Sequence, residues 1–191
     1  MKQELFATPI WNFQLNDHEK MNPELLRAGY NFKFSENFFD LPDPAVAKLR
    51  EFVVECITPI AEEYQWNNIP PTTIHGRQHP LKPNESDTLH FHPYARLIAV
   101  YYLQVTENSG DILLIDPRGG TFWPDLKTET GEYRLARTYH RVKPKPGMLL
   151  IFPNYLNHMV ETNLSDDTRL SIAMEIYDFP NVWLNFRKNN V

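Results

Sequence analysis

A chain of 191 residues with 42% apolar side chains can bury a substantial core. Its formal net charge of −5, without any basic cluster, argues against a surface for nucleic acid or anionic membranes. The single cysteine, Cys56, excludes an internal disulfide, and no apolar run is long enough to span a membrane. We therefore expect one domain over residues 1–191, and a cytoplasmic location because no signal peptide is apparent.

The first part of the chain, residues 1–66, predicts one strand followed by two helices. Residues 5–15 alternate loosely between apolar and polar side chains, which suits an edge strand because proline is tolerated there. A short helix is expected between residues 17 and 29, with Asn22 as its cap and Pro23 at its first helical position.

The clearest helical signal follows Asp43 and Pro44, a capping residue and a proline suited to the first turn. Apolar residues then recur at spacings of three and four as far as Ile60, with charged residues opposite them. Pro59 is expected to kink or reset this helix near its end. One apolar stripe of this kind indicates a helix that lies on a sheet.

Beyond residue 66, helical periodicity gives way to short apolar runs separated by turn residues such as Ser109–Gly110. The runs predict strands at residues 66–69, 88–91, 97–105, 111–115, 137–142, 148–152, 159–162 and 170–177. Many short strands with turns between them are typical of a jelly roll. We therefore predict a mainly β fold: a double-stranded β-helix over residues 67–180, with the N-terminal helices packed on its major sheet and a C-terminal tail from 181 to 191.

A pair of histidines in one predicted strand suggests a metal site. Side chains alternate along a strand, so His90 and His92 point to the same face, roughly 6.5–7 Å apart. His158 follows a later strand that would return beside this pair, and is the natural third ligand. Iron(II), manganese, zinc and copper all accept neutral imidazole. For any one of these histidines, an ordinary structural role is the alternative.

An arginine on the next predicted strand suggests a second, anionic ligand. Arg169 is followed by Ser171, whose hydroxyl would face the same way, and Tyr102 points inward from another strand. A buried carboxylate, such as the remote one of 2-oxoglutarate, is costly unless a guanidinium meets it with paired hydrogen bonds. A surface arginine and a plain core tyrosine are the alternatives.

These parts, in this order, resemble the superfamily of iron(II)- and 2-oxoglutarate-dependent dioxygenases, in which H-x-D, a distal histidine and R-x-S lie on a jelly roll. The resemblance extends over roughly residues 88–177, where Tyr101–Gln104 is similar to the Y-L-N strand of prolyl 4-hydroxylases. A narrower group, the 2-oxoglutarate/iron(II) oxygenases of bacteria and phages, is closer still. It shares residues 6–11, His90-x-His92-Pro93 and residues 116–118.

The sequence departs from the superfamily pattern at His92, where aspartate or glutamate is usual. Three neutral imidazoles leave more positive charge on iron, although cupin-type thiol dioxygenases use such a set. Asp116 or Asp87 is an alternative source of the missing carboxylate, and Arg118 is an alternative to Arg169 for holding the 2-oxo acid.

The resemblance implies an enzyme that uses iron(II), 2-oxoglutarate and dioxygen to hydroxylate a small-molecule or peptide substrate, with release of succinate and CO2. Tyr94, Arg96 and Trp123 are candidate substrate contacts, and a homodimer would suit the fold. Two alternatives stay open. One is a cupin-type three-histidine metalloenzyme that does not use 2-oxoglutarate, and the other is a jelly-roll binding protein without catalysis.

Overall fold

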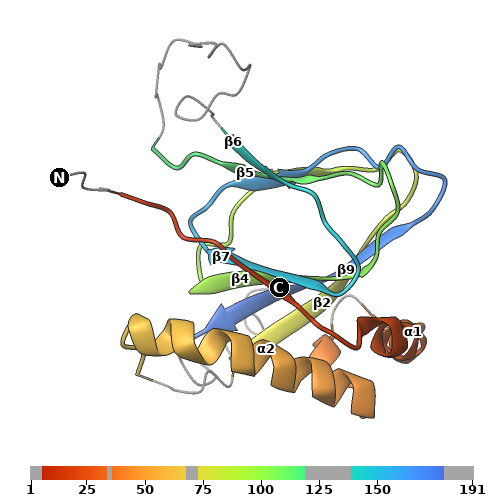
Figure 1. Ribbon diagram of the computed structural model, residues 1–191, viewed down its shortest axis with the longest axis horizontal. Coiled ribbons are helices and arrows are strands. Elements are labelled where there is room, and N and C mark those ends of the chain that lie inside the picture. The colour runs from red at the N-terminus through yellow and green to blue at the C-terminus, as the bar shows by residue number, and fades with distance from the viewer. Residues whose placement is uncertain (1–5, 34–35, 68–72, 119–138, 179–191) are drawn as a thin grey trace, which may run out of the picture.

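Two antiparallel sheets lie face to face in the computed structural model, which describes residues 6–33, 36–67, 73–118 and 139–178 (Figure 1). In spatial order, the major sheet consists of β1 (Trp11–Gln14), β7 (Met148–Pro153), β4 (Leu97–Gln104), β9 (Arg169–Tyr177) and β2 (Thr73–Leu81). The minor sheet consists of β3 (Asp87–His90), β8 (His158–Val160), β5 (Ile112–Ile115) and β6 (Tyr139–Val142). The predicted mainly β, jelly-roll fold class is confirmed.

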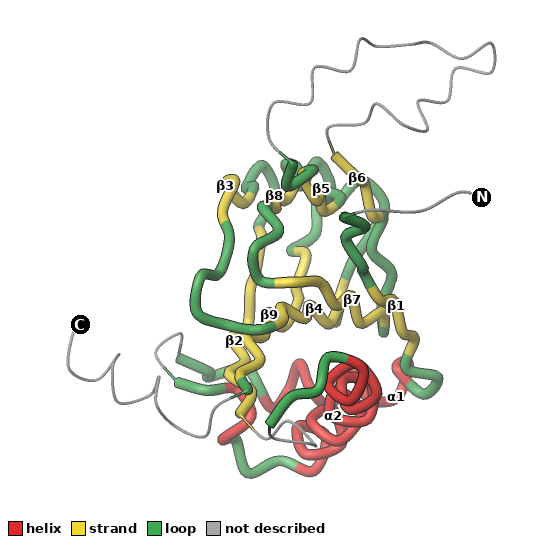
Figure 2. Tube along the Cα trace, turned by 90° about the vertical axis from the view of Figure 1, so that its left-hand side faces the viewer, coloured by secondary structure: helices red, strands yellow, loops and turns green. Residues whose placement is uncertain are grey.

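The helices cover the outer face of the major sheet, as Figure 2 shows. They are α1 (His18–Ala28), the 3-10 helix η1 (Phe38–Asp40) and α2 (Pro44–Glu63). The Asp43 carboxylate accepts the Ala45 amide at 2.8 Å, so the predicted cap of α2 is confirmed. This helix continues past Pro59 to its end at Glu63. None of the helices in the described segments is long and apolar enough to cross a membrane.

The beginning of α1 differs from the prediction. Asn22 does not cap the helix, which already begins at His18, and Pro23 lies inside it. The Asn22 side chain is buried instead, where it donates to the Leu103 carbonyl at 2.8 Å and accepts the Tyr101 hydroxyl at 2.7 Å. Asn22 therefore connects α1 to β4 through two hydrogen bonds. In the sequence, an asparagine before a proline has the same appearance as a helix cap, which explains the wrong assignment.

Strand β2 was not predicted. Its sequence, TIHGRQHPL, is polar and contains a proline, yet it pairs over its whole length with β9. Proline has no backbone N–H to donate. Pro80 is tolerated because β2 is at the edge of the major sheet and has no further strand beside it. The strand predicted at 66–69 is wrong where it can be compared, since Trp66 and Asn67 are not in a strand and 68–69 lie outside the described residues.

The turn predicted at Ser109–Gly110 is present, and glycine is required there. Gly110 has a φ of +93°, and a Cβ at this position would lie 2.3 Å from the Glu161 carbonyl oxygen. Both the backbone conformation and the space exclude a side chain. This turn connects β4 of the major sheet to β5 of the minor sheet.

Two apolar clusters result from the alternation of side chains along the strands. Between the major sheet and α2 lies a cluster that includes Leu49, Ile57, Tyr101, Ile172 and Met174. Between the two sheets lies a second cluster, which includes Ile98, Val100, Tyr102, Leu114 and Phe152. The candidate site lies beside the second cluster, several of whose residues line its cavity. The first cluster packs on the opposite face of the major sheet.

Candidate metal centre and its cavity

Three histidines converge between the sheets. His90 is the last residue of β3 and pairs across the ladder with His158, the first residue of β8. His92 follows in the loop after β3. One nitrogen from each ring lies within 4.8 Å of those of the other two, and the ring centroids are 4.3–5.3 Å apart. The structure therefore brings together the three histidines that the sequence spacing singled out.

Hydrogen bonds behind the rings determine which nitrogens face one another. Nδ1 of His90 lies 2.6 Å from the Thr88 carbonyl oxygen, and Nδ1 of His158 lies 2.9 Å from that of Leu156. Nδ1 of His92 lies 2.9 Å from a carboxylate oxygen of Glu175. Carbonyl and carboxylate oxygens only accept, so each Nδ1 carries a proton, and in the neutral form of each ring the lone pair is on Nε2. Such rings are preorganised to bind a cation.

The electrostatics of the cluster favour a neutral His158 beside an ionised Glu175. Burial lowers the pKa of His158 to about 4; the hydrogen bond to the Leu156 carbonyl opposes this shift, and the neighbouring His90 and His92 add to it. Burial would raise the pKa of Glu175, but hydrogen bonds from His92 and Tyr177, with the charge of Arg77, lower it to about 2. At neutral pH the lone pair of His158 is therefore free of a competing proton.

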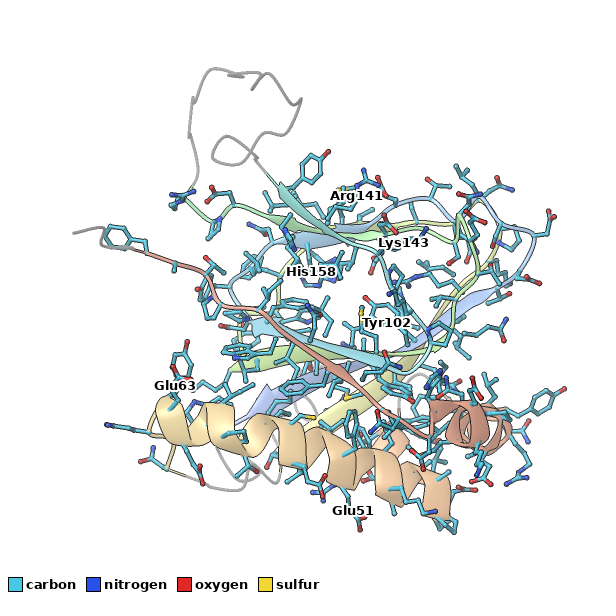
Figure 3. All side chains as sticks on the ribbon, in the orientation of Figure 1. Glu51, Glu63, Tyr102, Arg141, Lys143 and His158 are labelled. Carbon is cyan, nitrogen blue, oxygen red and sulfur yellow. The ribbon has the colours of Figure 1, made fainter. Side chains whose placement is uncertain are left out.

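A cavity of about 250 Å³ connects the histidines to Arg169. Figure 3 shows His158 and Tyr102 reaching into the space between the sheets from opposite sides. The Arg169 guanidinium is 1% exposed and lies over the Tyr102 ring, 5.1 Å from its centroid. Ser171 lines the same cavity. Arg169 and Ser171, with the Tyr102 ring that packs against the guanidinium, form what we call the arginine end of the cavity.

Several polar atoms at the arginine end have no hydrogen-bond partner. They are Nε and Nη1 of Arg169 and the hydroxyl of Tyr102, all fully buried. Burial lowers the pKa of Arg169, and burial raises the pKa of Tyr102 to about 12 despite the nearby guanidinium. Buried donors without acceptors are costly, typically by about 1–3 kcal/mol each. The arrangement is therefore that of a site for an anionic acceptor.

The alternative site residues lie elsewhere or at the margin. Asp116 is bound to Arg118, whose side chain is 54% exposed, and neither lines the cavity in the described part of the chain. Asp87 does line the cavity, with an oxygen 3.9 Å from Nε2 of His90 and 3.3 Å from Nε2 of His79. Of the two carboxylates considered, Asp87 is thus the one close to the histidines.

Two of the three candidate substrate contacts, Tyr94 and Arg96, do not line the cavity. Tyr94 is 61% exposed, and Arg96 forms an ion pair with Asp178 at 3.7 Å. Trp123 lies outside the described residues. His79, which was not among the candidate residues above, lines the cavity.

Glu175 is a site residue that the sequence reasoning missed. Alternation along β9 places Arg169, Ser171, Ala173 and Glu175 on one face, and the first three line the cavity. A strand period of two, extended from Arg169, would therefore have predicted that Glu175 is on the cavity face of β9, but not that it contacts His92.

Comparison with known proteins agrees with this geometry. A family model described as "Putative 2OG-Fe(II) oxygenase" matches residues 79–175, which include all three histidines and the arginine end of the cavity. The chain belongs to this family. Membership indicates an oxygenase and implies iron(II) and 2-oxoglutarate as its cofactor and co-substrate. No curated protein matches the sequence.

Solved structures of this superfamily share the fold. A prolyl-4-hydroxylase from Pseudomonas putida is similar with a TM-score of 0.62 and 13% identity, over 91% of this chain and 90% of that one. SnoK, a non-heme alpha-ketoglutarate-dependent carbocyclase from nogalamycin biosynthesis, has a TM-score of 0.61 and 12% identity, over 96% of this chain and 87% of that one. At 12–13% identity these comparisons establish a shared fold and carry no information about the substrate.

Proposed function

We propose that this oxygenase binds iron(II) through His90, His92 and His158 and 2-oxoglutarate through Arg169, and hydroxylates a small-molecule or peptide substrate. One observation carries the proposal. Three imidazoles, each with a ring nitrogen within 4.8 Å of those of the other two, share a cavity with a buried arginine whose Nε and Nη1 lack acceptors. A cation at one end and a dicarboxylate spanning the cavity would satisfy both groups together.

The histidine end fits iron(II). Neutral imidazole is a good ligand for this ion, and three ligands on one side leave positions for a co-substrate and dioxygen. The hydrogen bonds to Thr88, Leu156 and Glu175 hold the rings in the binding tautomer before the ion arrives. Little reorganisation of the protein is then needed when the ion binds.

The arginine end fits the remote carboxylate of 2-oxoglutarate. Nε and Nη1 of Arg169 would donate to the carboxylate, and we propose that the hydroxyls of Tyr102, which packs against the guanidinium, and Ser171, which lines the cavity, join them. A charged guanidinium at this depth would also cancel the charge of the anion it accepts. The same residues would reject a 2-oxo acid that lacks the second carboxylate, because the donors would remain unpaired.

When bound, iron(II) and 2-oxoglutarate supply the oxidation, in which the oxo acid becomes succinate and CO2 while one oxygen atom of dioxygen enters a substrate C–H bond. The chain contributes binding, orientation and a dry environment. The apolar side chains of Ile98, Val100, Ile112 and Val160 line the cavity between its two polar ends and limit the access of water.

The test is an anaerobic titration with iron(II) followed by 2-oxoglutarate, watched for the weak metal-to-ligand charge-transfer band. We expect the band to saturate at one equivalent of iron and to be absent from a His158→Ala variant. Succinate formation should require iron, 2-oxoglutarate and dioxygen. A protein that binds iron in neither experiment, or forms no succinate with iron bound, would refute the proposal.

The three-imidazole set favours a second candidate, a metalloenzyme of the cupin type that does not use 2-oxoglutarate. It predicts metal binding without the charge-transfer band. It also predicts that Arg169→Ala leaves oxygen consumption unchanged. The same titration therefore distinguishes the two candidates.

A further inference from the structure

The three candidate metal-binding histidines differ in the group that accepts a hydrogen bond from Nδ1. Nδ1 of His90 and of His158 faces a backbone carbonyl, whereas Nδ1 of His92 faces the Glu175 carboxylate. Three neutral imidazoles would leave the double charge of iron(II) uncompensated among the ligands themselves. We infer that Glu175 is a positioning residue that orients His92 and supplies negative charge to the metal centre through its ring. This inference rests on the proposed function.

The Glu175 carboxylate is held rigidly. Its Oε2 accepts the Tyr177 hydroxyl at 2.7 Å, and its Oε1 lies 2.9 Å from Nδ1 of His92 and 3.4 Å from a guanidinium nitrogen of Arg77. Its side chain is 13% exposed and comes from β9, within a sheet packed on both faces. Because both oxygens are engaged, the carboxylate fixes the plane of the His92 ring instead of following it.

A carboxylate does more for a ligand histidine than a carbonyl can. Both acceptors keep the proton on Nδ1 and leave Nε2 for the metal, but the carboxylate also makes Nε2 more basic through a charge-assisted bond. Removal of such a partner typically weakens metal binding by roughly 10–100-fold. The three histidines supply no negative charge themselves, and Glu175 would partly compensate for this by increasing the electron density that His92 donates to the ion.

Cobalt(II) is a suitable probe, because its visible bands report the ligand field without turnover. We expect Glu175→Gln to weaken cobalt(II) binding by roughly 10–100-fold and to shift the visible bands. Glu161→Gln is the matched control, since Glu161 is a carboxylate of the minor-sheet surface paired with Arg141. Equal affinities and spectra for parent and Glu175→Gln would overturn the inference.

A second comparison tests whether Glu175 acts through His92. In a His92→Ala background, adding Glu175→Gln should leave cobalt(II) affinity within twofold of that of the single variant. A further tenfold loss there would mean that the carboxylate acts on the ion directly, and the inference would be wrong.

A measurement on the parent protein does not depend on any variant folding. Long-range proton–nitrogen NMR correlations distinguish the two neutral histidine tautomers, and we expect metal-free His92 to carry its proton on Nδ1. A proton on Nε2 would overturn the inference. If the parent binds neither iron(II) nor cobalt(II), the proposed function itself fails, whereas a parent that binds metal as tightly as Glu175→Gln refutes only the role of Glu175.

Discussion

The two faces of the major sheet differ in how their buried polar groups are paired, although the same strands form both faces. On β9, Ile172, Met174 and Ile176 point toward the helices and join an apolar cluster. Arg169 and Ser171, which alternate with them, point into the cavity. Buried polar groups on the helix face, such as Asn22 with Tyr101, have partners, whereas those of Arg169 and Tyr102 do not.

The helix face of the sheet therefore contributes mainly to stability, and the cavity face mainly to ligand binding. A buried donor without an acceptor costs free energy in the ligand-free protein, and that cost is recovered only when an anion binds. The helix face, with its polar groups paired, provides the packing that offsets it. Substitutions on the two faces should therefore change different measured quantities.

The largest effect is expected for Arg169→Ala, which removes the guanidinium from the cavity. The loss of two charge-assisted hydrogen bonds, at about 1.5–3 kcal/mol each, should weaken 2-oxoglutarate binding by roughly 10²–10⁴-fold. The dissociation constant can be taken from the charge-transfer titration at saturating iron. Arg118→Ala is the control and should bind normally; the opposite pattern would assign the co-substrate to Arg118.

Ile172→Ala should affect the other face. Ile172 is fully buried in the helix-side cluster, and its truncation should lower the free energy of unfolding by about 2–5 kcal/mol. Denaturant unfolding measures this loss. The folded variant should bind 2-oxoglutarate with a dissociation constant within twofold of the parent, and a tenfold change would show that the two faces are coupled.

Tyr102→Phe should give smaller effects of opposite sign. Loss of a hydroxyl whose proton has no acceptor should raise the unfolding temperature of the ligand-free protein, because a desolvated donor disappears. The same change should weaken 2-oxoglutarate binding by up to about tenfold, which corresponds to about 1.4 kcal/mol. Thermal unfolding with and without iron and 2-oxoglutarate measures both. A destabilised ligand-free variant would contradict this account.

No effect is expected from thiol reagents on the native protein. Cys56 lies on the helix face, where burial and the charge of Glu55 raise the pKa of its thiol to about 12. At pH 8 the thiol therefore keeps its proton, and the reactive thiolate is scarce. Alkylation, followed by mass spectrometry, should require denaturation; rapid labelling of the native protein would show that α2 opens.

Among the strands that the structure describes, the sequence predicted all except the edge strand β2. Strands β4, β5 and β7 were found because their buried residues form continuous apolar runs, and β9 because buried apolar residues alternate with polar ones along it. Strand β2 was missed because an edge strand can be polar and contain proline. The cap assigned to Asn22 was wrong because its partners lie on β4, far away in the sequence.

Local pattern by itself predicted a jelly roll and the residues available for chemistry: two histidines two residues apart, a distant third histidine, and an arginine with a serine two residues later. The expectation that His90 and His92 share one strand was wrong for His92, which lies in the loop after β3. Tertiary structure alone decided which groups meet. It placed Glu175 behind His92, removed Asp116 and Arg118 from the cavity and left the Arg169 donors without acceptors. The reason is physical: alternation and propensity act over a few residues, whereas burial and pairing depend on strands that become neighbours only when the sheets close.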